Sequence, residues 1–105
     1  MIGAAVLASP YPLALLDEGK AVEREADRAL ARRIAGGDGD AFEHLVRRHH
    51  PHVARIAGRF FRRPVIVEEM VQEAFVKALT GIGGYRGEMP LEHWIARIAV
   101  NVCYG

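Results

Sequence analysis

The sequence predicts an all-α fold, a small bundle of four to five helices joined by short loops. Apolar residues recur at intervals of three and four through most of the chain, which is the spacing of one helix face. Glycine and proline cluster between these runs, and no segment shows the alternation expected of a strand. The chain has 105 residues, 50% of them hydrophobic, so it can form one small core.

The first two predicted helices are separated by a glycine pair. The first helix covers about residues 22–34, where apolar residues recur every four positions, and Gly36 and Gly37 end it. Asp38 or Asp40 can cap the next helix by accepting backbone N–H bonds. We favour Asp40 because it directly precedes the apolar pair at 41 and 42.

Two prolines divide the middle of the chain. Pro51 either kinks the second helix or starts a new one, and Pro64 ends this element. The next helix is expected to start near Val67. Its expected buried face consists of Met70, Val71, Ala74, Phe75, Ala78 and Leu79.

The segment from Thr80 to Pro90 has four glycines and is expected to be a loop. Pro90 is suited to the first position of the last helix. The apolar face of that helix would comprise Leu91, Trp94, Ile95, Ile98 and Val102, with Arg97 and Asn101 on the other side.

Several classes of function are disfavoured by composition. The net charge is +1, so any DNA contact requires a local basic patch. Cys103 is the single cysteine and is interpreted as a packing residue in a reducing compartment. Four histidines between 44 and 52 raise the question of zinc, but Pro51 breaks their helical register, so no metal or other cofactor is expected. The sequence contains no recognisable nucleophile–base pair, phosphate-binding loop or carboxylate dyad, which argues against an enzyme.

The chain resembles bacterial RNA polymerase sigma factors of the extracytoplasmic-function (ECF) type in three segments that occur in the family's order. GDGDAFEHLVRRHHPHVARIAGRF is similar to the opening of their region 2. EEMVQEAFVKAL resembles their polymerase-binding helix, and YRGEMPLEHWIARIAVN resembles the segment that recognises and opens the −10 promoter element. The resemblance extends from about Asp27 to Tyr104 and implies a promoter-melting domain that is not an enzyme.

A polar stripe on the expected helix near residue 70 is the candidate surface for a protein partner. Glu69, Gln72, Glu73 and Val76 are spaced i, i+3, i+4 and i+7, so they share one face. For an arbitrary helix this would be a solvated face. The resemblance implies that this helix docks on the basic clamp helices of the largest subunit of core RNA polymerase, where Arg–carboxylate pairs fix orientation.

Residues of the last third are the candidates for contact with single-stranded −10 DNA. The resemblance implies that the loop from Thr80 to Met89 holds a base flipped out of the non-template strand, with Tyr85 and Arg86 stacking or pairing with phosphate. The alternative is a flexible connector. Trp94 is either a core residue or an aromatic that replaces a lost stacking partner, and Asn101 either contacts a base or caps a helix. Arg97 belongs to the same expected set.

Four arginines lie between residues 55 and 63, just after the middle of the chain. Arg59, Arg62 and Arg63, with Arg55, can line the path of the DNA backbone, and such contacts weaken with salt. The alternative is a solvated basic face.

The expected organisation is a leader or extension over 1–26, either flexible or of artificial origin, followed by a region 2-like domain over 27–105. The apolar start of the chain is interrupted by Pro10 and Pro12, which disfavours a signal or a membrane anchor. The second, −35-reading domain of full-length relatives is expected to be absent. The expected function is binding of core polymerase and melting of −10 DNA in the cytoplasm, with an anti-sigma factor as a further partner. The alternative is a helical protein–protein interaction module without DNA binding.

Overall fold

The computed structural model describes residues 13–105, and in this part of the chain all regular secondary structure is helical, without strands. The elements are α2 (Leu13–Ala35), α3 (Gly39–Phe60), α4 (Pro64–Gly81), the short 3-10 helix η1 (Ile82–Gly84) and α5 (Leu91–Tyr104). The prediction of an all-α bundle with four to five helices is confirmed. Of the expected leader, residues 1–12 lie outside the described part, whereas 13–26 belong to α2, which continues across the expected boundary at 26 and 27.

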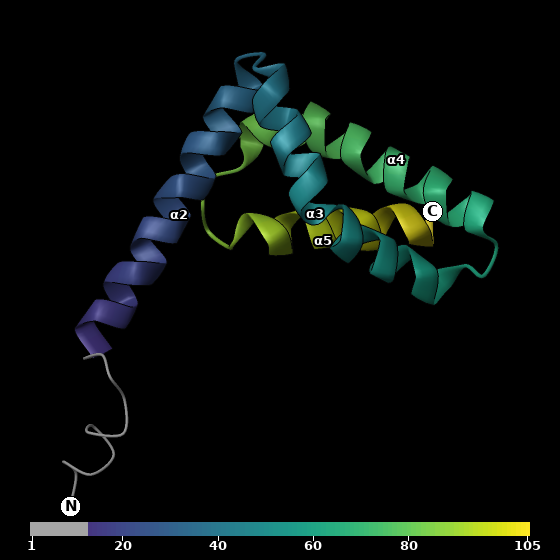
Figure 1. Ribbon diagram of the computed structural model, residues 1–105, viewed down its shortest axis with the longest axis horizontal. Coiled ribbons are helices and arrows are strands. Elements are labelled where there is room, and N and C mark those ends of the chain that lie inside the picture. Colours follow the sequence, from purple (N-terminus) through teal and green to yellow (C-terminus); the bar gives the residue numbers. More distant parts are fainter. Residues whose placement is uncertain (1–12) are drawn as a thin grey trace, which may run out of the picture.

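The helices pack in two groups that share α3 (Figure 1). The α2 helix runs back along the first half of α3, and α4 and α5 pack against α3 and each other. The α2 helix also contacts η1, far from it in sequence. The start of α2 projects away from the rest of the bundle.

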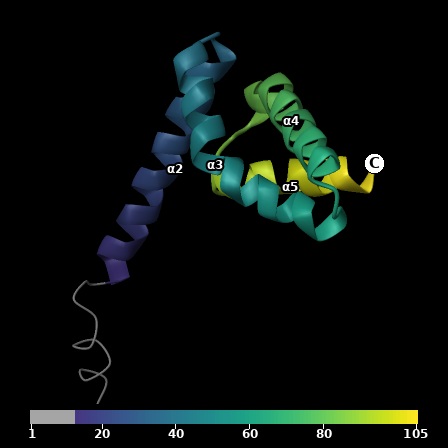
Figure 2. The same cartoon turned by 45° about the vertical axis from the view of Figure 1, so that its right-hand side comes forward.

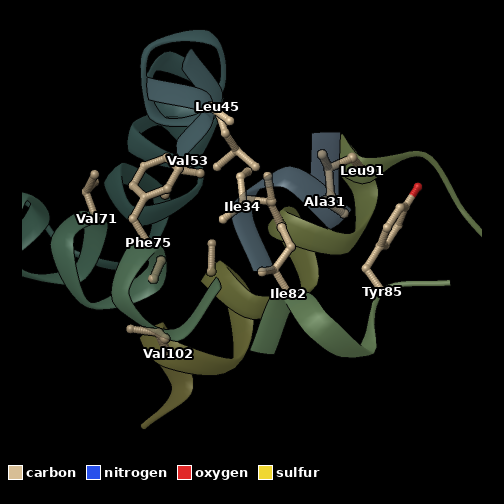
Figure 3. Close-up of a cluster of buried hydrophobic side chains, with 14 of the residues drawn as sticks. Ala31, Ile34, Leu45, Val53, Val71, Phe75, Ile82, Tyr85, Leu91 and Val102 are labelled. Carbon is tan, nitrogen blue, oxygen red and sulfur yellow. The ribbon is translucent and has the colours of Figure 1, made fainter. Parts of the chain in front are cut away.

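The core lies where α3, α4 and α5 meet, and Figure 3 shows its side chains. Leu45 and Val53 of α3, Val71 of α4, and Leu91 and Ile95 of α5 are almost completely buried. Burial of such side chains is worth roughly 1.5–3 kcal/mol each, so these five supply much of the driving force for packing α4 and α5 on α3. Ala31 and Ile34 attach α2 to the same core.

The helix boundaries correct the predictions in two places and decide between two alternatives in a third. Asp38, and not Asp40, caps α3, since its carboxylate accepts the Ala41 N–H at 3.0 Å. Of the two alternatives for Pro51, the structure shows the kink, because α3 continues through this residue and changes direction near its middle (Figures 1 and 2). The α4 helix begins at Pro64, three residues before Val67, because proline fits the first turn, where its missing N–H has no helical partner.

The glycine-rich segment is more ordered than a connector. Thr80 and Gly81 complete α4, and η1 follows directly. Ile82 and Tyr85 are buried, at 2% and 8% exposure, and they belong to the core cluster. Leu79, expected to be buried, is instead 44% exposed at the edge of α4.

Candidate functional site

The exposed stripe of α4 has the geometry that the sequence predicts. Glu69, Gln72 and Glu73 are exposed, and Val76 is 62% exposed. Val71, Ala74, Phe75 and Ala78 on the opposite face are buried and hold the helix on the bundle. Since α4 is fixed in this way, the four side chains are presented together from a rigid support.

The chemistry of this stripe is that of a carboxylate surface with an apolar edge. Glu73 lies 3.9 Å from Lys77, one turn further along α4, in an exposed pair that contributes little to stability. The neighbouring Leu79 extends the apolar edge formed by Val76. Such a surface fits a basic partner that also offers an apolar contact.

The residues of the loop that follows α4 form an open hollow near the C-terminal end of this helix. Gly84, Tyr85, Arg86, Glu88 and Met89 line it together with Trp94 and Arg97 of α5, and its volume is about 280 Å³. The structure therefore brings together four of the predicted DNA-binding residues, Tyr85, Arg86, Trp94 and Arg97. Arg86 and Arg97 are exposed, whereas Trp94 is partly buried against the core and also lines the hollow.

Tyr85 differs from the expectation of an exposed stacking side chain. Its hydroxyl donates a 2.6 Å hydrogen bond to the Met89 carbonyl, and its ring meets Trp94 edge-on at 5.8 Å between centroids. Burial raises the pKa of Tyr85, and the negative charge of Asp27 raises it further. Tyr85 therefore forms the inner wall of the hollow, and the loop around it is held in one shape.

Asn101 lies outside this hollow. It is exposed and lines a larger groove of about 550 Å³, which it shares with Met70, Glu73 and Lys77 of α4. It does not cap α5, because the helix continues to Tyr104. The structure thus groups Asn101 with the α4 stripe, while Arg97, one turn earlier, belongs to the hollow.

The arginines at the end of α3 form a separate exposed group. Arg59 lies in the last turn of α3, and Arg62 and Arg63 lie in the connection to α4. Figure 1 shows this connection at the end of α4 opposite to η1. The three arginines are exposed, as expected, but they do not line the hollow.

The histidines of α3 do not converge. His49 is buried, and burial lowers its pKa, with the charge of Arg48 adding to the effect. His50 stacks on Phe75 at 6.5 Å, and its Nε2 lies 3.9 Å from Glu68. Across residues 19–105, no three His, Cys, Asp or Glu side chains are grouped as a metal site would require. In the same residues no helix combines the length and apolarity needed to traverse a bilayer.

Two residues of α2 that the sequence did not single out contact the segment 87–91 beside the hollow. Asp27 accepts the Leu91 N–H at 2.9 Å, and Arg24 approaches the Gly87 carbonyl at 3.5 Å. In the sequence these residues appear only as the polar side of an amphipathic helix. Their partners lie more than sixty positions away, so no local pattern could reveal the contacts.

The chain is similar to known proteins over about three-quarters of its length. The family model for sigma-70 region 2 matches residues 45–104. The chain is 42% identical over 79 residues to the ECF RNA polymerase sigma-E factor of Haemophilus influenzae, covering 75% of this chain and 41% of that protein. It is 36% identical over 81 residues to the ECF sigma factor SigM of Mycobacterium tuberculosis, covering 77% and 41%. The chain thus spans about two-fifths of the length of these curated relatives.

Two solved structures share the fold. One is the NMR structure of an engineered region 2 of sigmaE in complex with GTAAAA, with a TM-score of 0.67 and 35% identity over 74% of this chain and 81% of that one. The other is CnrH in complex with the cytosolic domain of CnrY, with a TM-score of 0.67 and 34% identity over 75% of this chain and 51% of that one.

Proposed function

The chain belongs to the sigma-70 family, as a region 2 domain of the ECF type, and we propose that it binds core RNA polymerase and the single-stranded −10 element during transcription initiation. Sigma factors are regulators of transcription and not enzymes. One observation carries the proposal: a single rigid helical domain presents both a carboxylate stripe on α4 and a hollow lined by Arg86, Trp94 and Arg97.

The hollow suits an unstacked base. Holding a flipped base requires the stacking energy of a few kcal/mol to be recovered by close contact and hydrogen bonds. Gly84 lets the backbone approach a base closely, and the Trp94 ring offers an apolar wall. The guanidinium groups of Arg86 and Arg97 are exposed beside the hollow, where phosphates of a bound strand would pass. The complex of the sigmaE region 2 with GTAAAA supports this reading.

The polymerase is proposed as the partner of the α4 stripe. Glu69, Gln72, Glu73 and Val76 would meet the clamp helices of the largest subunit. The arginines at 59, 62 and 63 would guide the DNA backbone further along the bundle. Asn101 would contact the bound DNA strand where that strand passes the groove between α4 and α5. On this proposal the protein works in the cytoplasm.

An anti-sigma factor is a further proposed partner. The related CnrH was solved with the cytosolic domain of CnrY, and an inhibitor that covers the α4 stripe would exclude polymerase. A helical interaction module without DNA binding is less well supported, because it gives no reason for the lined hollow.

Fluorescence anisotropy with labelled single strands tests the proposal. The probes are GTAAAA, a panel in which each base is replaced in turn, and the corresponding duplex. We expect at least one replacement to weaken binding about tenfold, the equivalent of one well-read base. Affinity should also fall with salt, by a slope of about 0.7 per neutralised phosphate. Equal affinity for all of these probes would contradict the proposal.

A further inference from the structure

We infer that α2 is the positioning element of the hollow, and that Asp27 sets base selectivity through α5 and the loop without touching DNA itself. This inference rests on the proposed function. The inference goes beyond that function by assigning a role to a helix that contributes no side chain to the hollow. Three contacts, each between α2 and the segment 87–91, carry it.

Asp27 supplies a helix cap from another helix. The first turn of a helix has N–H groups without partners and a partial positive charge, and a nearby carboxylate satisfies both. The N-cap position of α5 is occupied by Pro90, whose side chain makes no capping bond. Asp27 accepts the Leu91 N–H at 2.9 Å instead. The start of α5, which carries Trp94 one turn later, is thus fixed by α2.

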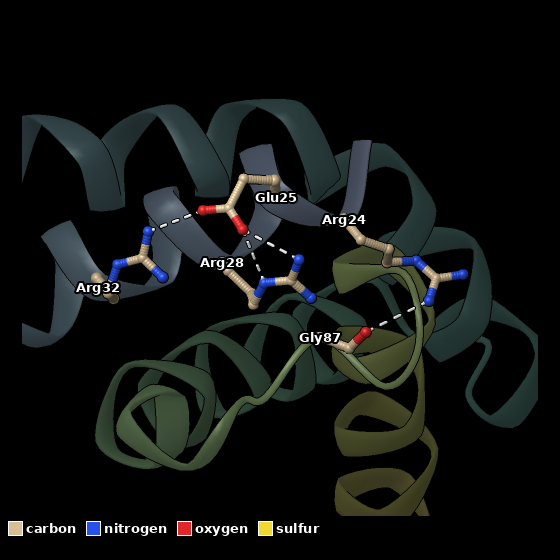
Figure 4. A network of polar contacts seen from close by, with 5 residues as sticks. All are labelled: Arg24, Glu25, Arg28, Arg32 and Gly87. Carbon is tan, nitrogen blue, oxygen red and sulfur yellow. Dashed lines mark hydrogen bonds and ion pairs between the residues drawn. The ribbon is translucent and has the colours of Figure 1, made fainter. Parts of the chain in front are cut away.

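Arg28 fixes the loop by close packing against Gly87. Figure 4 shows both residues, with the pairing of Arg28 to Glu25. Gly87 has a φ of +81°, and a Cβ added there would lie 2.5 Å from Nη1 and 2.9 Å from Cγ of Arg28. The arginine side chain therefore lies directly against the backbone of the loop. It is held there by Glu25, whose carboxylate pairs with Arg28 and Arg32 at 3.0 Å.

Arg24 adds a longer contact to the same residue, with Nη1 3.5 Å from the Gly87 carbonyl. Gly87 is thus covered on one side by two arginines of α2, and the loop cannot move without displacing them. The Tyr85 hydroxyl donates to the Met89 carbonyl, so Gly87 lies within the turn that this hydrogen bond closes. A shift of Gly87 would therefore also shift Tyr85, which forms a wall of the hollow. The shape that a base meets is therefore set by α2.

The test compares Asp27→Ala with Asp27→Asn in the 105-residue chain. Alanine removes the acceptor for the Leu91 N–H, whereas asparagine keeps one. Glu23→Ala is the matched control, because Glu23 is an exposed carboxylate on the same helix. Amide hydrogen exchange of residues 85–91 and the anisotropy panel with single-base replacements are measured for each variant.

For Asp27→Ala we expect Leu91 amide exchange to be about fivefold faster, the equivalent of one lost cap. The affinity ratio between the preferred and the replaced base should fall toward one, while the salt slope stays the same. Asp27→Asn and Glu23→Ala should keep both properties within about twofold.

The outcomes separate this inference from the proposed function. Unchanged exchange in Asp27→Ala would overturn the positioning role, whatever the binding data show. Faster exchange with unchanged selectivity would overturn the link to base choice. If the unaltered chain binds no single strand, the proposed function fails, and with it the claim on selectivity, while the exchange data still decide whether α2 positions the loop.

Discussion

Asp38 shows how one side chain fixes the connection between two helices. Its Oδ1 accepts the Ala41 N–H at 3.0 Å, and its Oδ2 accepts from Arg33 of α2 at 3.0 Å. These contacts, first the backbone bond and then Arg33, lower the pKa of Asp38. The carboxylate therefore both caps α3 and ties the end of α2 to it.

Replacing Asp38 should destabilise the fold, whereas replacing Asp40 should not. Because its folded pKa is lowered, the contribution of Asp38 is present above its ordinary pKa of 3.8 and is lost as the pH falls through the lowered value. We expect Asp38→Ala to reduce the melting temperature at pH 7, and the difference from the unaltered protein to shrink below about pH 4. Thermal unfolding monitored by circular dichroism measures both. An equal or larger effect of Asp40→Ala would show that the cap is misassigned.

Gly87 is a residue at which both the backbone conformation and the neighbouring side chain require glycine. Its φ of +81° strains any side chain, and a Cβ would collide with Arg28. We expect Gly87→Ala to lower the free energy of unfolding by ~1–2 kcal/mol. Gly83→Ala is the control, because no atom lies within 4 Å of a Cβ at that position. Chemical denaturation of both variants measures the effect, and a loss no larger for Gly87 than for Gly83 would contradict it.

At the scale of the element, α3 is the helix that the other three helices share. Leu45 and His49 are buried before Pro51, and Val53 and Ala57 are buried after it. Pro51 removes one backbone hydrogen bond and bends the helix, but the packing on both sides keeps it continuous. A local pattern cannot decide between a kink and a new helix at Pro51, since the outcome depends on the helices that pack against each half.

His49 makes the packing of α3 sensitive to pH. Burial lowers its pKa, as does Arg48, while Glu92 and Asp27 oppose the shift and His52 adds to it. The neutral imidazole is therefore favoured in the folded state. Its contribution is fully present above the ordinary value of 6.5 and is lost as the pH falls through the lowered value.

We therefore expect the chain to lose stability from about pH 6.5 downwards and His49→Leu to reduce that loss. His44→Gln is the control, because His44 is exposed on the same helix. Urea denaturation at several pH values measures the effect. The same pH dependence in His49→Leu and in the unaltered protein would exclude His49 as its source.

At the scale of the whole molecule, the stripe and the hollow occupy different parts of one domain. The stripe begins near the start of α4, and the hollow lies beyond its end. Charges separated by more than a Debye length, about 8 Å at physiological salt, are largely screened from each other. A substitution in one surface should therefore leave binding at the other surface nearly unchanged.

Reversal of charge at Glu69 and Glu73 tests this independence. We expect Glu69→Lys combined with Glu73→Lys to abolish capture by core polymerase in a pull-down, because two carboxylates would become cations facing a basic partner. Binding of GTAAAA should stay within about twofold at physiological salt. Glu43→Lys, an exposed change on α3, is the control for polymerase binding. Full retention of polymerase binding by the double variant would place the partner surface elsewhere.

Periodicity was enough to predict the all-α fold and the exposed stripe. Glu69, Gln72, Glu73 and Val76 follow from helical spacing alone, because α4 is regular and buries only one face. The hollow could be predicted only in part. Glycines suggested an open loop, but Tyr85 is buried, and its environment includes Asp27, 58 positions earlier. Contacts of such sequence separation leave no periodic signal.

The dependence of α5 on Asp27 has a practical consequence for chimeras. An exchange of residues 80–90 between two members of the family would move the loop part of the lining but leave behind the α2 side chains that contact this loop. The recipient's own side chains at positions 24, 27 and 28 would then meet a foreign backbone. A transplant designed to carry promoter preference from one protein to another should therefore include this short stretch of α2 as a second insert.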